Sequence, residues 1–139
     1  MKPFVVGIDA GGTSVRIQYA DSETGAPVGE SQLFRASATG EPPLDFPPPA
    51  HPVSSVCAGI TKFTRDNIPG SWERFLQTQF PDARIVVVPD YVIAFHGALS
   101  SGSGVAVIAG TGSVAYGENT GNGESARCGG RGWEWGDEG

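Results

Sequence analysis

The sequence has little cysteine, no cluster of basic residues and no long apolar run, and each absence excludes a class of protein. Its two cysteines, Cys57 and Cys128, lack CxxC spacing and give no metal signal, so a reduced cytoplasmic protein is the default prediction. Fifteen acidic side chains outweigh nine basic ones, which argues against nucleic acid or an anionic membrane as the main partner. The opening "MKPFVVGIDA" is too short an apolar run for a signal peptide, and no segment is long enough to span a bilayer.

The two common phosphate-binding fingerprints are also missing from the apolar opening "FVVGIDAGGTSVRIQYAD". A dinucleotide fingerprint needs a helix after its glycine turn, and a Walker loop needs Gly-Lys-Ser/Thr at the start of a helix. Here the residues after the glycines alternate, with Val15, Ile17 and Tyr19 on one face. Because a period of two indicates a strand, the stretch predicts a hairpin with Asp-Ala-Gly-Gly-Thr at its tip.

This first tip has the composition of a phosphate-binding turn. Gly11 and Gly12 can adopt positive φ and let the backbone approach a ligand, so that N–H groups converge on an anion together with Thr13. Asp9, at the end of the first strand, is placed to hold a hydrated Mg²⁺ beside the phosphates. Taken alone, the stretch favours an ordinary tight hairpin with a glycine turn over a phosphate-binding role.

The stretch "AGTGS" at 109–113 repeats the same arrangement, since an apolar strand ends, a glycine turn follows and another strand begins. Two such tips in one short chain favour a device that grips a triphosphate through backbone N–H groups and threonine hydroxyls. The second tip consists of Gly110, Thr111, Gly112 and Ser113.

Asp90 lies between the tips, in "VVVPDYVIAFHGAL", where an apolar strand runs into an apolar helix. A carboxylate at the carboxyl end of a strand opens into the crevice where α/β sheets bind ligands. Asp90 could accept the proton of a substrate hydroxyl that attacks a γ-phosphate, or it could only cap the helix. The two roles can coexist.

The pattern along the chain predicts a meander of three strands, a surface crossing without helix at "TGEPPLDFPPPAHP", and then alternating strands and helices. An aromatic-groove ligand is a minor alternative for the proline-rich segment. Ser71 is the expected N-cap of the first helix, and His96 is expected to pack. We predict a fully buried strand in the middle of a parallel sheet at "ARIVVVPD" and a second buried strand at "GVAVIAG". The expected strands are 4–9, 13–20, 28–36, 53–58 and 84–88, and the hairpins after Val105 are expected beyond them or in a second sheet.

The motifs together resemble the amino-terminal half of the BadF/BadG/BcrA/BcrD ATPase family, in particular its N-acetylglucosamine kinase-like branch. "GIDAGGTS" resembles the first phosphate motif, "GVAVIAGTGSVAYG" the second, and "GGRGWEWGDEG" the sugar-binding stretch. The resemblance implies an α/β domain of the ribonuclease H-like, actin-like ATPase type, with a mixed β-sheet flanked by helices. It spans residues 1–139 as one phosphate-binding domain, without the family's second, adenosine-binding domain.

The resemblance also implies the chemistry: ATP and Mg²⁺ as cofactors and a small sugar as substrate. Asp90 would be the general base, Asp9 would serve Mg²⁺, and Thr13 and Thr111 would contact phosphates. The hexosamine would be bound by Gly130, Arg131, Gly132 and Asp137. Two departures leave the sugar open, because Arg131 stands where the family often has Trp and the proline-rich segment lacks a substrate-contacting Asn.

Two other functions stay open beside the hexosamine kinase. One is an ATPase that activates an iron–sulfur dehydratase or a benzoyl-CoA reductase, for which Cys128 is the candidate ligand at a dimer interface. The other is an inactive half-domain. Because closure of two domains aligns donor and acceptor, the isolated 139-residue chain is expected to fold without measurable kinase activity unless a homodimer completes the cleft.

Overall fold

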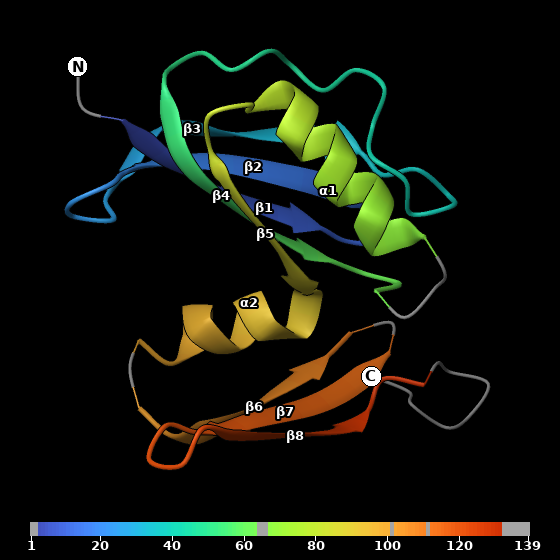
Figure 1. Cartoon of the computed structure of the whole chain (residues 1–139). Coiled ribbons are helices and arrows are strands. Elements are labelled where there is room, and N and C mark those ends of the chain that lie inside the picture. Colours follow the sequence, from blue (N-terminus) through green and yellow to red (C-terminus); the bar gives the residue numbers. More distant parts are fainter. Residues whose placement is uncertain (1–2, 64–66, 101, 111, 132–139) are drawn as a thin grey trace. The chain divides into compact units, whose positions relative to one another are not determined.

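The computed structural model describes residues 3–63, 67–100, 102–110 and 112–131 (Figure 1). They form two compact units, Met1–Asp90 (unit 1) and Tyr91–Gly139 (unit 2). None of the helices in this described part is long and apolar enough to cross a membrane.

Unit 1 is a five-stranded mixed sheet with β1 at its centre. β1, β2 and β3 form the predicted antiparallel meander, and β4 and β5 continue the sheet in parallel, in the order β3-β2-β1-β4-β5. The strands are β1 (Phe4–Ala10), β2 (Ser14–Asp21), β3 (Pro27–Arg35), β4 (Val53–Ile60) and β5 (Arg84–Pro89). The predicted α/β fold class and the central place of the first strand are confirmed.

The prediction that 84–88 lies in the middle of the sheet is wrong. Among the described strands β5 pairs only with β4 and is an edge strand, with Arg84 exposed and Val86 36% exposed. A short apolar run shows that a strand forms but not how many neighbours it has. β5 ends at Pro89, which lacks an N–H and suits an edge position.

Helix α1 (Ile68–Gln79) covers one face of this sheet with a stripe of buried side chains. Ile68, Trp72 and Leu76 recur every four residues and join the core formed by alternate positions of β1, β2 and β4. The helix begins before the predicted cap Ser71, because Pro69 fits the first turn and the N-cap is Asn67. Ser71 instead donates its hydroxyl to Glu41 Oε1 at 3.3 Å.

The proline-rich segment has no helix between Pro42 and Pro52, as predicted. It packs onto α1 through Phe46, whose ring centroid lies 5.1 Å from that of Phe75 and 6.2 Å from that of Phe80. Trp72 Nε1 also donates a hydrogen bond to the carbonyl of Gly40 at 2.9 Å. The segment therefore closes the edge of the core.

Unit 2 is a three-stranded antiparallel sheet with helix α2 preceding it. The strands β6 (Gly104–Ala109), β7 (Ser113–Asn119) and β8 (Glu124–Gly129) follow α2 (Asp90–Ala98) and lie in the order β6-β7-β8. This is the second sheet allowed for in the prediction. The prediction of a buried strand at "GVAVIAG" is wrong, because Val105 and Val107 are 69% and 72% exposed. A run of valines and alanines has no polar face that would mark its exposed side.

Candidate phosphate-binding and catalytic site

The first tip joins β1 to β2 in unit 1 and is held by two backbone hydrogen bonds. Gly11 N donates to Ser14 O at 2.9 Å, and Ala36 N donates to Thr13 O at 3.0 Å. Gly12 and Thr13 are exposed. Neither glycine of the tip has a positive φ, so the conformational reason expected for them does not apply. A Cβ on Gly12 would meet nothing within 4 Å, so this glycine instead leaves the space in front of the backbone open.

Asp9 ends β1 with an exposed side chain, on the face opposite to its buried neighbours Ile8 and Ala10. In the sheet it lies across from Arg16 on β2 and from Gly59 on β4. Because Gly59 has no side chain, it leaves space beside the Asp9 carboxylate on the β4 side. Among the described residues no three His, Cys, Asp or Glu side chains gather as a metal site. A single carboxylate that acts through water is nevertheless sufficient for Mg²⁺.

Asp90 and the first tip lie at the same end of the strands of the unit 1 sheet, where β1, β4 and β5 end. The strand register aligns Ala10 with Ile60 and Ile60 with Pro89. The tip follows Ala10 and Asp90 follows Pro89, so one strand separates them, about 10 Å at the usual strand spacing. Asp90 is partly buried and is the first residue of α2, where its charge also suits the helix dipole. Its possible roles as helix cap and as base therefore remain compatible.

The second tip lies in unit 2, between β6 and β7. Gly110 N donates to Gly112 O at 2.9 Å. Gly130 N donates to Ser113 O at 2.8 Å, which joins the end of β8 to this tip. Gly130 has φ +72°, a conformation that strains any other residue, and a Cβ there would also lie 3.3 Å from Val114 Cγ2, a tight contact. The structure thus brings a predicted phosphate residue and a predicted sugar residue together.

Three other predicted site residues, Thr111, Gly132 and Asp137, lie outside the described residues. Arg131 is described and exposed.

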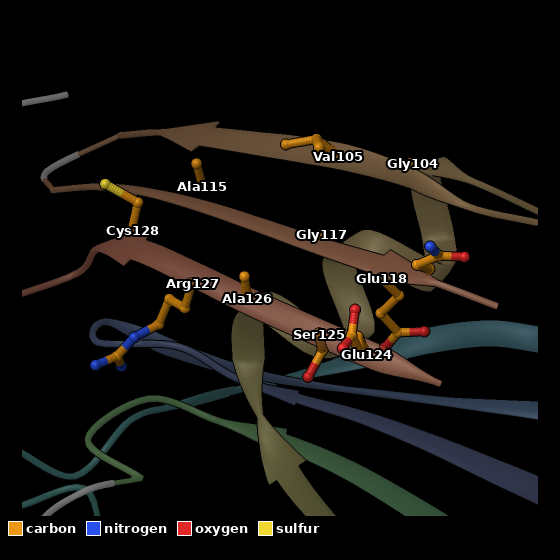
Figure 2. Close-up of a pocket in the computed structure, with 11 residues that line it drawn as sticks. Gly104, Val105, Ala115, Gly117, Glu118, Glu124, Ser125, Ala126, Arg127 and Cys128 are labelled. Carbon is orange, nitrogen blue, oxygen red and sulfur yellow. The ribbon is translucent and has the colours of Figure 1, made fainter. Parts of the chain in front are cut away.

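An open groove of about 730 Å³ lies on the three-stranded sheet, and no motif in the sequence predicts it (Figure 2). Val105, Ala115 and Cys128 are on one side of the strands, whereas Arg127 points to the other side. None of the described residues predicted to bind phosphate, Mg²⁺ or sugar or to act as the base lines this groove, whereas Cys128, the candidate iron–sulfur ligand, does. It is therefore a feature separate from the two tips.

Comparisons with known proteins point to kinases of amino sugars. No family model matches the sequence. The N-acetylmuramic acid/N-acetylglucosamine kinase of Clostridium acetobutylicum is 38% identical over 86 residues, which cover 62% of this chain and 28% of that protein. This match confirms the resemblance to N-acetylglucosamine kinases that the motifs indicated.

Two solved structures share the fold. A candidate N-acetylglucosamine kinase from Chromobacterium violaceum has a TM-score of 0.64 at 23% identity, over 94% of this chain and 50% of that one. The ethanolamine utilization protein EutJ from Carboxydothermus hydrogenoformans has a TM-score of 0.57 at 15% identity, over 91% of this chain and 52% of that one. The chain spans about half the length of these structures. The predicted actin-like ATPase fold is confirmed.

Proposed function

We propose that this chain supplies the phosphate-binding and general-base part of an ATP-dependent hexosamine kinase. It resembles N-acetylglucosamine kinases in sequence and fold. The observation that carries the proposal is the strand register of unit 1. It supports a site in which the tip after β1 and the carboxylate after β5 face one crevice. The sequence match to an amino-sugar kinase supports the choice of substrate class.

The proposed mechanism divides the work among the residues of the chain. Backbone N–H groups of Gly11, Gly12, Gly110 and Gly112, with the hydroxyls of Thr13, Thr111 and Ser113, bind the ATP phosphates. Asp9 would hold Mg²⁺ through water, and the chemistry that the bound ion would supply is neutralisation of charge on the phosphoryl oxygens.

The acceptor side of the proposed site consists of the sugar-binding stretch and the base. Gly130, Arg131, Gly132 and Asp137 hold the hexosamine so that one of its hydroxyls lies within reach of Asp90. Asp90 takes the hydroxyl proton as the oxygen attacks the γ-phosphorus, and ADP leaves from the opposite side. Because little covalent chemistry is needed, positioning and charge stabilisation provide most of the rate.

Binding of Mg-ATP to the 139-residue chain tests the first tip, with Gly12→Ala as the variant and Gly7→Ala as its matched control. Both glycines lack a positive φ, and a Cβ on either would meet nothing within 4 Å, so both changes leave the fold intact. We expect weak binding of Mg-ATP. In Gly12→Ala the added Cβ occupies the space in front of the backbone, so the affinity should fall by about tenfold, the effect of losing one charge-assisted hydrogen bond to a phosphate, while Gly7→Ala leaves the affinity unchanged. The dissociation constants are measured by calorimetry. Equal effects of the two variants would refute the proposal that the first tip binds the ATP phosphates.

A panel of sugars tests the substrate, and it needs a complete kinase, meaning a polypeptide in which residues 1–139 are joined to an adenosine-binding domain. We expect Mg-ATP-dependent phosphorylation of N-acetylglucosamine or a close amino sugar, a raised KM in Asp137→Ala, and no measurable turnover by residues 1–139 alone. ATP hydrolysis at the same rate with and without every sugar would instead indicate an activator-type ATPase. An unchanged sugar KM in Asp137→Ala would remove that residue from the site.

A further inference from the structure

A tight turn at 37–40 follows β3 in unit 1 and is joined to the first tip through the residue before it. Gly40 N donates to Ser37 O at 3.0 Å, which closes the turn. Directly before the turn, Ala36 N donates to Thr13 O at 3.0 Å. The backbone of the tip is therefore bonded to the same short segment that forms the turn.

Two side chains from other elements of unit 1 donate to carbonyl groups of this turn. Lys62, two residues after the end of β4, donates from Nζ to Ala38 O at 2.6 Å. Trp72 of α1 donates from Nε1 to Gly40 O at 2.9 Å. Because β2 and β1 separate β3 from β4 in the sheet, Lys62 joins two segments that the pairing of the strands does not join.

Lys62 makes its contact from an unfavourable backbone conformation. Its φ of 56° lies in the left-handed region, which strains residues other than glycine. Gly40 is adapted to the lysine, since it has φ +88° and a Cβ there would lie 3.2 Å from Lys62 Cδ. The residue before the lysine is also fixed, because Thr61 N donates to Ala10 O at 2.9 Å. Such strain persists only where the surroundings impose it, and it is concentrated at functional sites.

We infer that Lys62 is a positioning residue for the first tip. It acts through the 37–40 turn: its ammonium group holds the carbonyl of Ala38, and the segment that carries this carbonyl also carries Ala36 N, which holds Thr13 O. The backbone of the tip is thereby fixed in the conformation that presents its N–H groups and the Thr13 hydroxyl. The inference rests on the proposed function for its catalytic meaning, since the tip binds phosphate only in that function. The hold on the tip can be measured without any ligand.

The experiment compares Lys62→Met with Gln77→Met in the 139-residue chain. Lys62→Met keeps a long unbranched side chain and removes the donor. Gln77→Met is the matched control, because Gln77 Nε2 also donates to a backbone carbonyl, Pro81 O at 3.0 Å. That bond lies shortly before β5 begins, at the other end of the strands from the tip. The readouts are the rate of amide hydrogen exchange at Ala36 and the amide ¹⁵N resonances of the first tip.

We expect Lys62→Met to speed exchange at Ala36 by about tenfold and to move the resonances of the tip, because one charge-assisted hydrogen bond is lost. Gln77→Met should change neither readout. Lys62→Arg keeps a charged donor and should bring the exchange rate back to within about twofold of the wild type. The inference would be overturned by unchanged exchange at Ala36 in Lys62→Met, by an equal effect of Gln77→Met, or by equal acceleration throughout β1 and β4, which would indicate a general loss of stability.

Calorimetry with Mg-ATP on the same variants tests the catalytic meaning. We expect Lys62→Met to weaken binding by about threefold, less than Gly12→Ala, because the tip is loosened and not blocked, and Lys62→Arg to restore it. Unchanged affinity in Lys62→Met would overturn the inference. Weaker binding with unchanged exchange at Ala36 would also overturn it, since the lysine would then contact the phosphates directly. If the wild-type chain binds no Mg-ATP, the proposed role of the tip fails, but the exchange rates still decide whether Lys62 positions it.

Discussion

Unit 1 and unit 2 each begin their sheet with an antiparallel hairpin that carries glycine and threonine at its tip, but they differ greatly in what they bury. The main hydrophobic cluster lies entirely in unit 1, from Val6 on β1 to Ala83 before β5. The buried hydrophobic side chains described in unit 2 are Phe95 and Tyr116. The same hairpin motif is thus supported by an extensive hydrophobic core in unit 1 and by a small aromatic cluster in unit 2.

This difference indicates that unit 1 carries most of the stability of the chain, whereas unit 2 depends on a few contacts. Burial of apolar surface is the main favourable contribution to folding, and it is roughly proportional to the area removed from water. Elements with few buried contacts open first in native proteins. Substitutions should therefore affect the two units unequally.

The largest effect is expected from Trp72→Ala. Trp72 is 1% exposed in the unit 1 core and donates a hydrogen bond to the Gly40 carbonyl. Its loss should lower the free energy of unfolding by about 3–5 kcal/mol in urea denaturation. The neighbouring exposed residue supplies the control: Glu73→Ala should stay within about 0.5 kcal/mol of the wild type.

Phe95→Ala should loosen unit 2 alone, and by less. Phe95 is the most buried side chain of the unit, so the change should cost about 3 kcal/mol, the lower end for loss of a buried aromatic. Hydrogen exchange should speed up in α2 and β7 while the amides of β1 and β4 keep their rates. Equal acceleration in β1 would mean that the two units unfold together, which would contradict the comparison.

A matched pair of valines sharpens the contrast. Val56 on β4 is 1% exposed, whereas Val107 on β6 is 72% exposed. Val56→Ala should destabilise by about 2 kcal/mol, since it removes two buried methyl groups and leaves a cavity. Val107→Ala should change the free energy of unfolding by less than about 0.5 kcal/mol. Similar values for the two variants would show that the exposed face of β6 is covered in solution.

A pH titration gives the smallest effect. Because the pKa of Tyr116 is raised in the folded chain, its protonated form contributes stability below the unfolded value of 10.0, and that stability is lost as the pH rises through the folded pKa. Burial raises the pKa of the Cys57 thiol as well, so the comparison is best made in a Cys57→Ser background. Thermal unfolding should show a loss above pH 10 that Tyr116→Phe reduces. An identical alkaline loss in Tyr116→Phe would assign it to other groups.

Much of the fold could be predicted because its signals are local. Alternation at Val15, Ile17 and Tyr19 sets the second strand, and the glycines before it set the turn. The proline-rich segment excluded a helix for a covalent reason, the fixed φ and missing N–H of proline. These features needed no knowledge of the neighbours of each strand.

Features set by long-range pairing could not be predicted in the same way. The edge position of β5 depends on its having β4 as its only partner, which the run of valines does not encode. The contact of Gly130 with Ser113 depends on the register between β7 and β8. His96 was expected to pack, but its side chain is largely exposed and lies beside Glu118, a residue distant in the sequence. The roles assigned to the tip residues and to Asp90 stay predictions.

The measurement that tests the central claim most directly is phosphoryl transfer by Asp90→Asn in the complete kinase, with the ATP dissociation constant measured in parallel. A general base acts mainly in the transition state, where it is worth about 10²–10⁴-fold, and the amide keeps the size of the side chain. The account predicts a loss of turnover of that order with nearly unchanged ATP binding. Wild-type turnover in the Asn variant would contradict it and would leave Asp90 as no more than the cap of α2.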